Sequence, residues 1–405
     1  MFARRISLSI AILFSVLCAA CVTEPQDRSG LAELPTDYSI NIHNWHHENK
    51  AVSAFSGGME RIFKFRVVKK GLGATPLPYS ENQYVFEDVD NYLTRNRVMG
   101  VLIIKDGNIV LEKYAFDRSE SHRFQSKSMV KSVVSLLIGM AIEEGKIASI
   151  DDLAKRYLPD LDEHPYGNTS IRHLLQMSSG VKFKNMTDYP KTSDTETLER
   201  VSWRGYGPGG LSTVMPFKNR PRISTPGTKF YYSSAETQVL GLILRETTGM
   251  PLSDYLSEKI WRPMGAESSA TWWVDKSGQE PAYDGLGATL RDYARLGVLL
   301  ANDGAIGGNQ IVPKKWVLEA TQPTPGYPHL KPGRATSYHG YGYQFWIMPT
   351  HGRQFAMLGG RGQAVFVDPN LKLVMAQNSA FKKGDDTSPR ELHELWRDVV
   401  RKYQR

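Results

Sequence analysis

Runs of β-branched and aromatic residues bounded by turn residues predict strands in two parts of the chain. Segments 98–105 and 108–116 flank Asp106-Gly107, a dipeptide that favours a two-residue hairpin turn. The later strands are predicted at 341–348, 353–358, 363–369 and 372–379. Because an isolated hairpin is only marginally stable, we expect the early and late strands to pair in one antiparallel sheet.

Helical periodicity predicts the elements that cover this sheet. Residues 130–142, within the segment 124–147, are apolar almost all round, which is typical of a helix buried on most sides. Further helices are predicted at 82–97, 236–249, 289–301, 313–321 and 388–403. With terminal helices on the sheet and a helical lobe inserted beside it, and with no alternation of strand and helix, the fold class is α+β.

The first twenty residues have the character of a secretory signal peptide. Arg4 and Arg5 precede an apolar run at 6–20, which is shorter than the ~20 residues that a membrane-spanning helix needs. Leu17-Cys18-Ala19-Ala20-Cys21 resembles a bacterial lipobox, which predicts cleavage before Cys21 and lipidation of that cysteine. Plain secretion and an uncleaved anchor are the alternatives. All three place the body outside the cytoplasm, on the periplasmic face of a bacterial membrane if Cys21 is lipidated.

Composition and charge narrow the function classes. The chain has only two cysteines, both near the start, which excludes a disulfide-stapled scaffold and a Cys-based zinc site. Its net charge of +8 becomes 48 − 42 = +6 without residues 1–20. The basic residues are scattered, so we expect no nucleic-acid partner. We divide the chain into a signal peptide at 1–20, a tether with an irregular extension at 21–81, and one folded domain at 82–405.

Three Ser-x-x-Lys patterns occur, and only Ser128-Met129-Val130-Lys131 opens a long buried helix; the others begin at Ser179 and Ser379. In a helix, residues three apart lie on one face, one turn from each other. A lysine among apolar neighbours loses solvation, which lowers its pKa and lets it accept the serine proton. The local pattern leaves two interpretations open: a nucleophile with its base, or the start of a surface helix with a solvent-reaching lysine.

Two further segments contain residues that are typical of an active site. Tyr232 lies in Tyr231-Tyr232-Ser233-Ser234, just before the helix at 236–249, where its phenol would serve as a general acid or base if it met Lys131. Gly359-Gly360-Arg361-Gly362 forms a turn between two predicted strands. Glycines there allow close approach to a ligand. Packing for Tyr232 and simple turn formation for the glycines are the alternative interpretations.

In order and spacing these three segments resemble the serine β-lactamase and penicillin-recognising hydrolase superfamily. The resemblance is to its class C β-lactamase-related branch, which includes lactamase-fold esterases and 6-aminohexanoate-dimer hydrolases. It covers roughly residues 82–403. Besides the three segments above, residues 172–181, 284–304 and 359–369 also resemble the family. It implies a β-lactamase/transpeptidase-like fold.

The resemblance also implies roles for individual residues. Ser128 would be acylated, Lys131 would activate it, and Tyr232 would carry the proton to the leaving group. The backbone N–H groups of Ser128 and Gly360 would form the oxyanion hole. No cofactor and no metal are implied, and the partner would be a small ester or amide substrate.

The sequence departs from many β-lactamases at two places. Met357-Leu358-Gly359 stands where they carry Lys-Thr-Gly, and Tyr232-Ser233-Ser234 stands where they carry Tyr-x-Asn. We therefore expect an esterase or linear amidase. A non-catalytic binding or sensing lipoprotein is one alternative, and a β-lactamase or D,D-peptidase is another. An α/β-hydrolase and a metallohydrolase are disfavoured because Gly-x-Ser-x-Gly and His-Glu-x-x-His are absent. We expect loops at 183–224 to select the substrate, and Arg361 either to replace the missing cation or to lie exposed.

Overall fold

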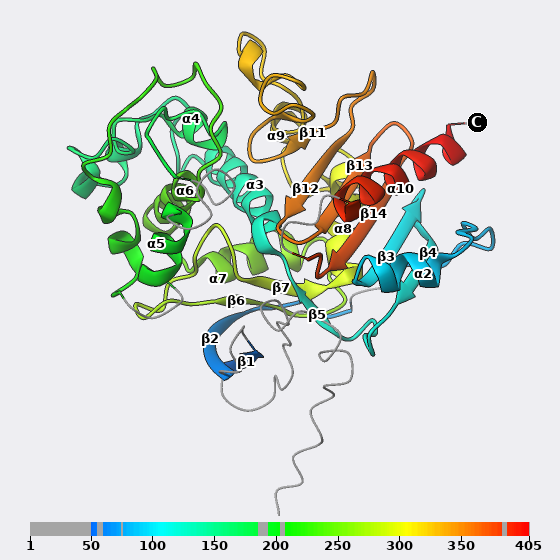
Figure 1. Cartoon of the computed structure of the whole chain (residues 1–405). Helices are drawn as coiled ribbons and strands as arrows, with labels where there is room; N and C mark the ends of the chain where they lie inside the picture. Colours follow the sequence, from blue (N-terminus) through cyan, green and yellow to red (C-terminus); the bar gives the residue numbers. More distant parts are fainter. Residues whose placement is uncertain are drawn as a thin grey trace, which may run out of the picture.

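A seven-stranded antiparallel sheet forms the centre of the molecule, in the order β10-β11-β12-β13-β14-β3-β4 (Figure 1). The computed structural model describes residues 50–54, 60–73, 76–184, 193–202, 207–382 and 387–404. The strands of this sheet are β3 (Val98–Lys105), β4 (Asn108–Tyr114), β10 (Gly340–Tyr341), β11 (Trp346–Ile347), β12 (Phe355–Gly359), β13 (Gln363–Asp368) and β14 (Leu373–Ser379).

The predicted pairing of the early hairpin with the late strands is confirmed. β14 pairs antiparallel with β3, with Val374 opposite Ile104. Asp106 and Gly107 both have positive φ, at 51° and 80°, as a two-residue turn that follows the twist of the strands requires. Strands β3 and β14, which are more than 250 residues apart in the sequence, are therefore joined by backbone hydrogen bonds within one sheet.

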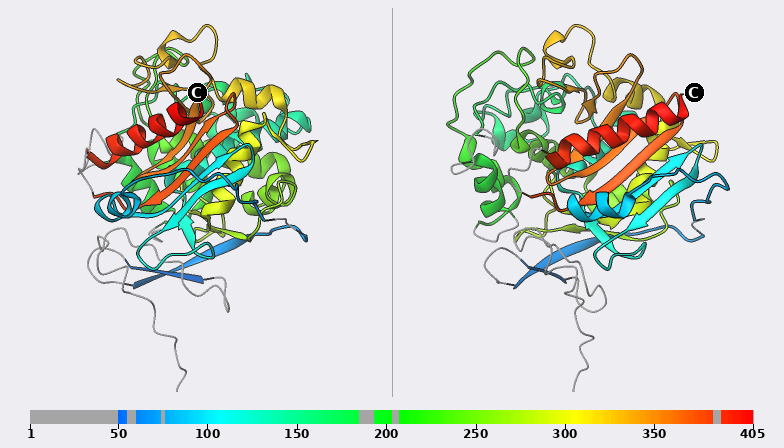
Figure 2. Two further views of the ribbon diagram at one scale, coloured as in Figure 1. Left: turned by 90° about the vertical axis from the view of Figure 1, so that its right-hand side faces the viewer. Right: turned by 45° about the vertical axis from the view of Figure 1, so that its right-hand side comes forward.

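Helices cover both faces of this sheet, so its strands are buried on both sides. Leu102 and Ile104 face the core that contains α8 (Leu290–Ala301), whereas Val101 and Ile103 face α2 (Val89–Arg95) and α10 (Thr387–Tyr403). Figure 2 shows α10 lying across the outer face of the sheet. This alternation is what a period of two requires, and it confirms that terminal helices cover the sheet.

A helical lobe lies beside the sheet, and α3 runs between the two (Figure 1). Nearly every residue of α3 is buried, as its apolar sequence predicts. The lobe and its connections contain α3 (Val130–Glu143), α4 (Ile171–Leu175), α5 (Asp194–Val201), α6 (Ser234–Thr248), α7 (Leu252–Leu256) and α9 (Lys314–Ala320), with short helical turns at 127–129, 154–156, 159–161, 210–213, 215–217, 257–261 and 328–330.

A second sheet, which the sequence analysis did not predict, lies beneath the body. Its five strands are ordered β1-β2-β6-β7-β5. They span β1 (Lys50–Ala54), β2 (Glu60–Val68), β5 (Arg123–Gln125), β6 (Ala270–Trp273) and β7 (Leu286–Thr289); β8 (Ala305–Ile306) and β9 (Asn309–Gln310) form a separate hairpin. The prediction of an irregular extension up to residue 81 is therefore wrong for β1 and β2. β2 gains its order by pairing with β6, some 200 residues away, which no local pattern reveals.

Two predicted elements differ in length. The helix expected at 82–97 is reduced to α2, because the segment before it runs alongside β4, where the N–H of Tyr84 donates to the carbonyl of Val110. The strand expected at 341–348 is two short strands, β10 and β11, because Gln344 between them adopts a φ of 63°.

The predicted signal peptide and Cys21 lie outside the described residues. Among the residues that the structure does describe, no helix is long and apolar enough to span a membrane.

Candidate active site

Ser128 lies where β5 gives way to α3, in the short helical turn Lys127–Met129. The preceding residue, Lys127, has a φ of 47°, a left-handed conformation that costs a non-glycine residue free energy and is concentrated at functional sites. This sharp turn presents the Ser128 side chain to a pocket beside the helix N-terminus. The predicted position of Ser128 at the opening of a buried helix is confirmed.

Lys131 follows one turn later and faces Ser128. Its Nζ donates to Ser128 Oγ at 3.0 Å and to the backbone carbonyl oxygen of Tyr283 at 3.0 Å. The Lys131 residue is only 1% exposed, so the alternative of a solvent-reaching lysine is wrong. The apolar neighbours on α3 leave Nζ with these two oxygens in place of water.

Burial lowers the pKa of the Lys131 ammonium to about 7, while the carboxylates of Asp284 and Glu199 act against the shift. Asp284 is itself close to a second cation, because its Oδ2 lies 3.8 Å from Lys127 Nζ. Desolvation outweighs these partners, so Lys131 is largely neutral at slightly alkaline pH. A neutral amine at hydrogen-bonding distance from a serine hydroxyl is able to accept its proton.

Tyr232 lies beside Ser128 and Lys131, so the structure brings the three predicted side chains together. Lys131 Nζ lies 5.3 Å from the centroid of its ring. Burial raises the pKa of the Tyr232 phenol well above its ordinary value, and a hydrogen bond with Ser128 opposes that rise only in part. The phenol therefore stays protonated where Lys131 is already neutral. Of the two groups, Lys131 is suited to accept a proton and Tyr232 to donate one.

Aromatic rings form the wall around Tyr232. Its ring stacks on Trp346 with centroids 5.5 Å apart, and Tyr341 meets it edge-on at 6.4 Å. Phe230 contacts Tyr341 at 4.9 Å. These rings come from the segment before α6 and from the β10–β11 hairpin, so the wall joins the helical lobe to the edge of the large sheet.

The glycine turn after β12 lies against the Ser128 turn. A Cβ atom on Gly359 would lie 2.3 Å from the carbonyl oxygen of Ser126, so only glycine permits this approach. Gly360 follows directly, and it lines the same pocket as Ser128. Ser128 and Gly360 therefore border one pocket, and the oxyanion-hole role of their backbone N–H groups stays a prediction.

Ser128 opens into a pocket of about 550 Å³. Its described lining is Ser128, Phe230, Tyr231, Tyr232, Ala335, Thr336, His339, Trp346, Leu358, Gly359 and Gly360. No Asp, Glu, Lys or Arg is among these residues. Burial, together with nearby His393, lowers the pKa of the His339 imidazole to about 3, which keeps it neutral. The described lining is therefore largely aromatic and carries no charged side chain.

Two expectations about the surroundings of Ser128 are not met by the described residues. Arg361 is absent from the pocket lining, and its guanidinium donates to the carbonyl of Phe381, because the turn directs it away. The described residues of 183–224 do not line the pocket either. They pack on the lobe, where Arg222 donates to the carbonyl of Pro165. Ala335, Thr336 and His339 border the pocket in their place.

The other two Ser-x-x-Lys patterns serve structural purposes. Ser179 Oγ donates to Glu236 Oε1 at 2.6 Å inside the lobe. Ser379 Oγ, in β14, donates to the backbone of the glycine turn. Across the described part of the chain, no three His, Cys, Asp or Glu residues are grouped closely enough to hold a metal ion.

Sequence reasoning missed His339, Trp346 and the carbonyl of Tyr283. A backbone carbonyl carries no sequence signal, since every residue has one. The many aromatic residues at 338–346 are a signal for Trp346, but they are equally typical of the strand predicted there.

Known proteins resemble this chain in sequence and in fold. A model of the beta-lactamase family matches residues 87–394, about three quarters of the chain. The chain belongs to the beta-lactamase family. A 6-aminohexanoate-dimer hydrolase of Paenarthrobacter ureafaciens is 25% identical over 302 residues, which are 74% of this chain and 76% of that protein.

Solved structures of other proteins superpose on this chain. A Bacillus anthracis protein provisionally named a 6-aminohexanoate-dimer hydrolase superposes with a TM-score of 0.74 at 25% identity, covering 83% of this chain and 90% of that one. A penicillin-binding protein from Bacillus halodurans has a TM-score of 0.58 at 19% identity, covering 76% and 99%, and shows the shared fold alone. The predicted β-lactamase/transpeptidase-like α+β fold is confirmed, and the chain is a serine hydrolase of this family.

Proposed function

We propose that this beta-lactamase family protein hydrolyses ester or linear amide bonds through an acyl-enzyme on Ser128. The observation that supports it most is the buried Lys131 Nζ, 3.0 Å from Ser128 Oγ at the wall of an uncharged pocket. Lys131 is the proposed base, because its pKa is lowered to about 7 while that of Tyr232 is raised. Tyr232 is the proposed proton donor to the leaving group.

Acylation would begin as Lys131 Nζ takes the proton from Ser128 Oγ, which then forms a bond to the substrate's carbonyl carbon. The carbonyl oxygen becomes an oxyanion, held by the backbone N–H groups of Ser128 and Gly360. Removing one such donor from a hydrolase costs ~3 kcal/mol of barrier. When the oxyanion collapses, the bond to the leaving group breaks. The leaving nitrogen or oxygen takes a proton from Tyr232, and the Tyr232 phenol is restored from Lys131.

Deacylation would reverse these roles with water as the nucleophile. The neutral Lys131, assisted by Tyr232, takes a proton from water, and the new hydroxyl adds to the acyl carbon. Collapse then breaks the bond to Ser128 Oγ, which regains its proton, and the carboxylic acid product leaves. Each step requires only groups within the site.

The uncharged pocket supports esters and linear amides rather than β-lactams. A β-lactam carries a carboxylate, and burying a charge without a partner is costly. No cation lines the described pocket, and the only imidazole in it is neutral. The linear amide bond of the Paenarthrobacter relative's named substrate is of the proposed class. We infer that the part of the substrate next to the reacting carbonyl is uncharged.

The test is hydrolysis of a panel containing p-nitrophenyl butyrate, 6-aminohexanoate dimer and a β-lactam, together with a fluorophosphonate label. Ser128→Ala is expected to abolish both turnover and labelling. Ser179→Ala, from another Ser-x-x-Lys pattern, is the matched control and should retain both. Equal labelling of Ser128→Ala and the unmodified protein would exclude Ser128 as the nucleophile. Turnover of the β-lactam alone would overturn the substrate class.

We also propose that the protein is exported and anchored through a lipid on Cys21. The supporting pattern is the apolar run before Leu17-Cys18-Ala19-Ala20-Cys21. Mass spectrometry of the mature N-terminus should find a diacylglyceryl-modified Cys21. An unmodified Cys21, or a chain that begins at Met1, would rule out the anchor.

A further inference from the structure

The connection between β6 and β7, residues 274–285, carries two groups that act on Lys131. The carbonyl oxygen of Tyr283 accepts a hydrogen bond from Lys131 Nζ at 3.0 Å. Asp284 is one of the two carboxylates whose charge acts on Lys131. The position of this connection therefore determines what Nζ contacts.

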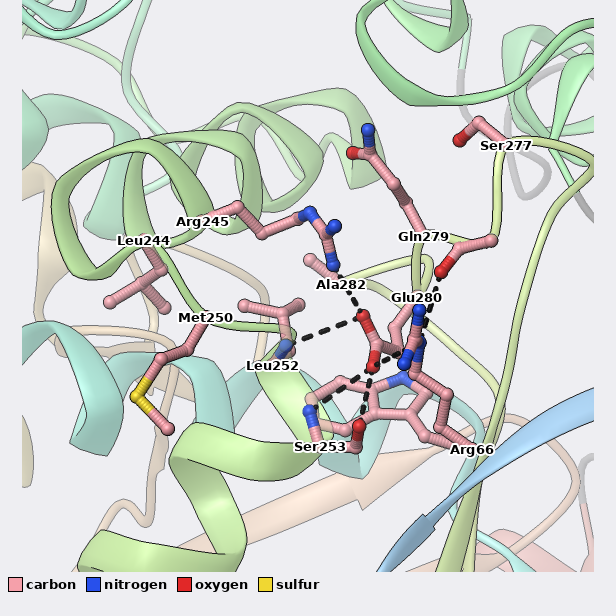
Figure 3. A network of polar contacts seen from close by, with 12 residues as sticks. Arg66, Leu244, Arg245, Met250, Leu252, Ser253, Ser277, Gln279, Glu280 and Ala282 are labelled. Atoms are coloured by element: carbon pink, nitrogen blue, oxygen red, sulfur yellow. Dashed lines mark hydrogen bonds and ion pairs between the residues drawn. The ribbon is translucent and has the colours of Figure 1, made fainter.

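Glu280, three residues before Tyr283, fixes the connection to the body (Figure 3). Its side chain is 0% exposed and its carboxylate is fully occupied. Oε1 accepts from Ser253 Oγ at 2.6 Å and from the Ser253 N–H at 3.2 Å. Oε2 accepts from Arg245 Nη1 at 3.0 Å and from the Leu252 N–H at 3.3 Å.

Arg66 adds a tie to the N-terminal strand β2. Its Nε donates to the carbonyl of Gly278 at 3.1 Å and lies 3.7 Å from Glu280 Oε1. Figure 3 shows Arg66 reaching from β2 to the carboxylate, opposite Arg245 of α6. Glu280 thus joins the connection to three separate elements, β2, α6 and the start of α7.

The residues between Glu280 and Lys131's acceptor are fixed as well. The N–H of Ala282 donates to Gln238 Oε1 at 3.0 Å, and Trp272 Nε1 donates to the carbonyls of Pro281 and Asp284. The backbone from 280 to 284 has little freedom to adjust on its own. Glu280 is therefore one of several contacts that together set the position of the Tyr283 carbonyl, and its loss would loosen that position.

We propose that Glu280 is a positioning residue for Lys131, and that Arg66 makes the N-terminal strand β2 part of the same support. The proposal rests on the proposed function, since it concerns the base of that reaction. Glu280 does not contact Ser128 or the pocket. It acts through Tyr283 and Asp284, which fix the Lys131 amine and close its surroundings to water.

The groups around Lys131 Nζ determine how its pKa would respond if the 274–285 connection moved. Ser128 and the rings of Tyr232 and Tyr283 surround Nζ, with the carboxylates of Asp284 and Glu199 nearby and Lys127 beyond Asp284. If the connection moves, water reaches Nζ and desolvation weakens. The lysine pKa then rises towards its ordinary value of 10.5. A smaller fraction of Lys131 is neutral at pH 7, so the rate falls there and recovers at alkaline pH.

The test compares Glu280→Gln with Asp292→Asn in the full chain. Asp292 is a matched control because it is also a buried carboxylate, accepting from the N–H groups of Glu267 and Ser268 at 2.7 and 3.0 Å without touching the 274–285 connection. For Glu280→Gln we expect the midpoint of the acidic limb of kcat/KM to rise by about one pH unit, with a rate about fivefold lower at pH 7. At pH 9.5 the rate should be nearly restored. Asp292→Asn should lower Tm and leave the midpoint unchanged.

Arg66→Met is a milder variant, because Glu280 keeps Arg245 and its backbone donors. It should shift the midpoint in the same direction by a smaller amount, and it carries the test if Glu280→Gln does not fold. A lowered Tm with an unshifted midpoint, in every Glu280 and Arg66 variant that folds, would show that the network is only structural and would overturn the proposal. Ser128→Ala distinguishes this failure from failure of the proposed function, because only the latter predicts that Ser128→Ala retains activity.

Discussion

The two sides of the Ser128 side chain, a polar side around Lys131 and an aromatic side around Tyr232, are built from different kinds of contact. On the polar side, α3 and the 274–285 connection place Lys131 Nζ between two oxygens, each at 3.0 Å. On the aromatic side, Tyr232, Trp346, Tyr341 and Phe230 meet through rings whose centroids are 4.9–6.4 Å apart. Hydrogen bonds weaken steeply with distance and angle, whereas ring contacts vary gradually.

This difference implies that the two sides contribute to different steps, the polar side to proton transfer and the aromatic side to substrate binding. The polar side contains the groups that would move protons, so changes there should lower kcat. The aromatic side is apolar and uncharged, so changes there should mainly alter substrate binding and KM. Tyr232 belongs to both sides, since its ring is part of the wall while its phenol is hydrogen-bonded to Ser128. Substitutions on each side test this division.

The largest effect is expected on the polar side. Lys131→Met keeps an apolar chain in the buried site and removes the base, so kcat/KM should fall by about 10³. Steady-state kinetics on p-nitrophenyl butyrate measures it. Lys182→Met is the control, because Lys182 belongs to another Ser-x-x-Lys pattern and is exposed; it should have no effect. If kcat/KM of Lys131→Met fell by less than tenfold, a residue other than Lys131 would be the base.

An intermediate effect is expected for Tyr232→Phe, which keeps the ring against Trp346 and removes the phenol. On a linear amide, kcat should fall by about 10² because the leaving nitrogen needs a proton. On p-nitrophenyl butyrate the loss should be much smaller, since p-nitrophenolate leaves as a stable anion. Measuring kcat on both substrates gives the ratio. Equal losses on the two would contradict the role of proton donor to the leaving group.

The smallest effect is expected on the aromatic side. Trp346→Leu removes ring contacts of about 1 kcal/mol, so KM for an apolar ester should rise about fivefold while kcat stays within twofold. Trp396→Phe is the control: Trp396, in α10, stacks on Phe366 at 5.4 Å and does not line the pocket, so the substitution should alter Tm without altering KM. A fall in kcat greater than the rise in KM would show that the wall acts on the chemistry.

The sequence predicts the parts of this site that depend on local spacing. Ser128 and Lys131 meet because residues three apart share a helix face, and the β3–β14 pairing follows from two sets of strands that need each other. The Tyr283 carbonyl depends on a connection whose course is set by Glu280, Arg66 and Arg245, from three elements distant in sequence. No pattern along the chain indicates such a convergence.

The protonation states of His339 and Lys131 also depend on the fold and cannot be predicted from the sequence. His339 reads in sequence as an ordinary imidazole, yet burial and His393 hold it neutral. Lys131 reads as a cation, and only the surrounding apolar core of α3 lowers its pKa. The same dependence on long-range packing hid β2, which the sequence assigns to an irregular segment and the structure pairs with β6.

The most direct test of the central claim, that a buried and neutral Lys131 activates Ser128, is the rate of Ser128 acylation as a function of pH in single-turnover experiments. The protonated lysine cannot accept a proton, so the rate should fall about tenfold per unit below the Lys131 pKa and level off above it. We predict a half-maximal rate near pH 7, with the acyl adduct on Ser128. A half-maximal rate near 10.5, the ordinary lysine value, or an adduct on another residue, would contradict the account.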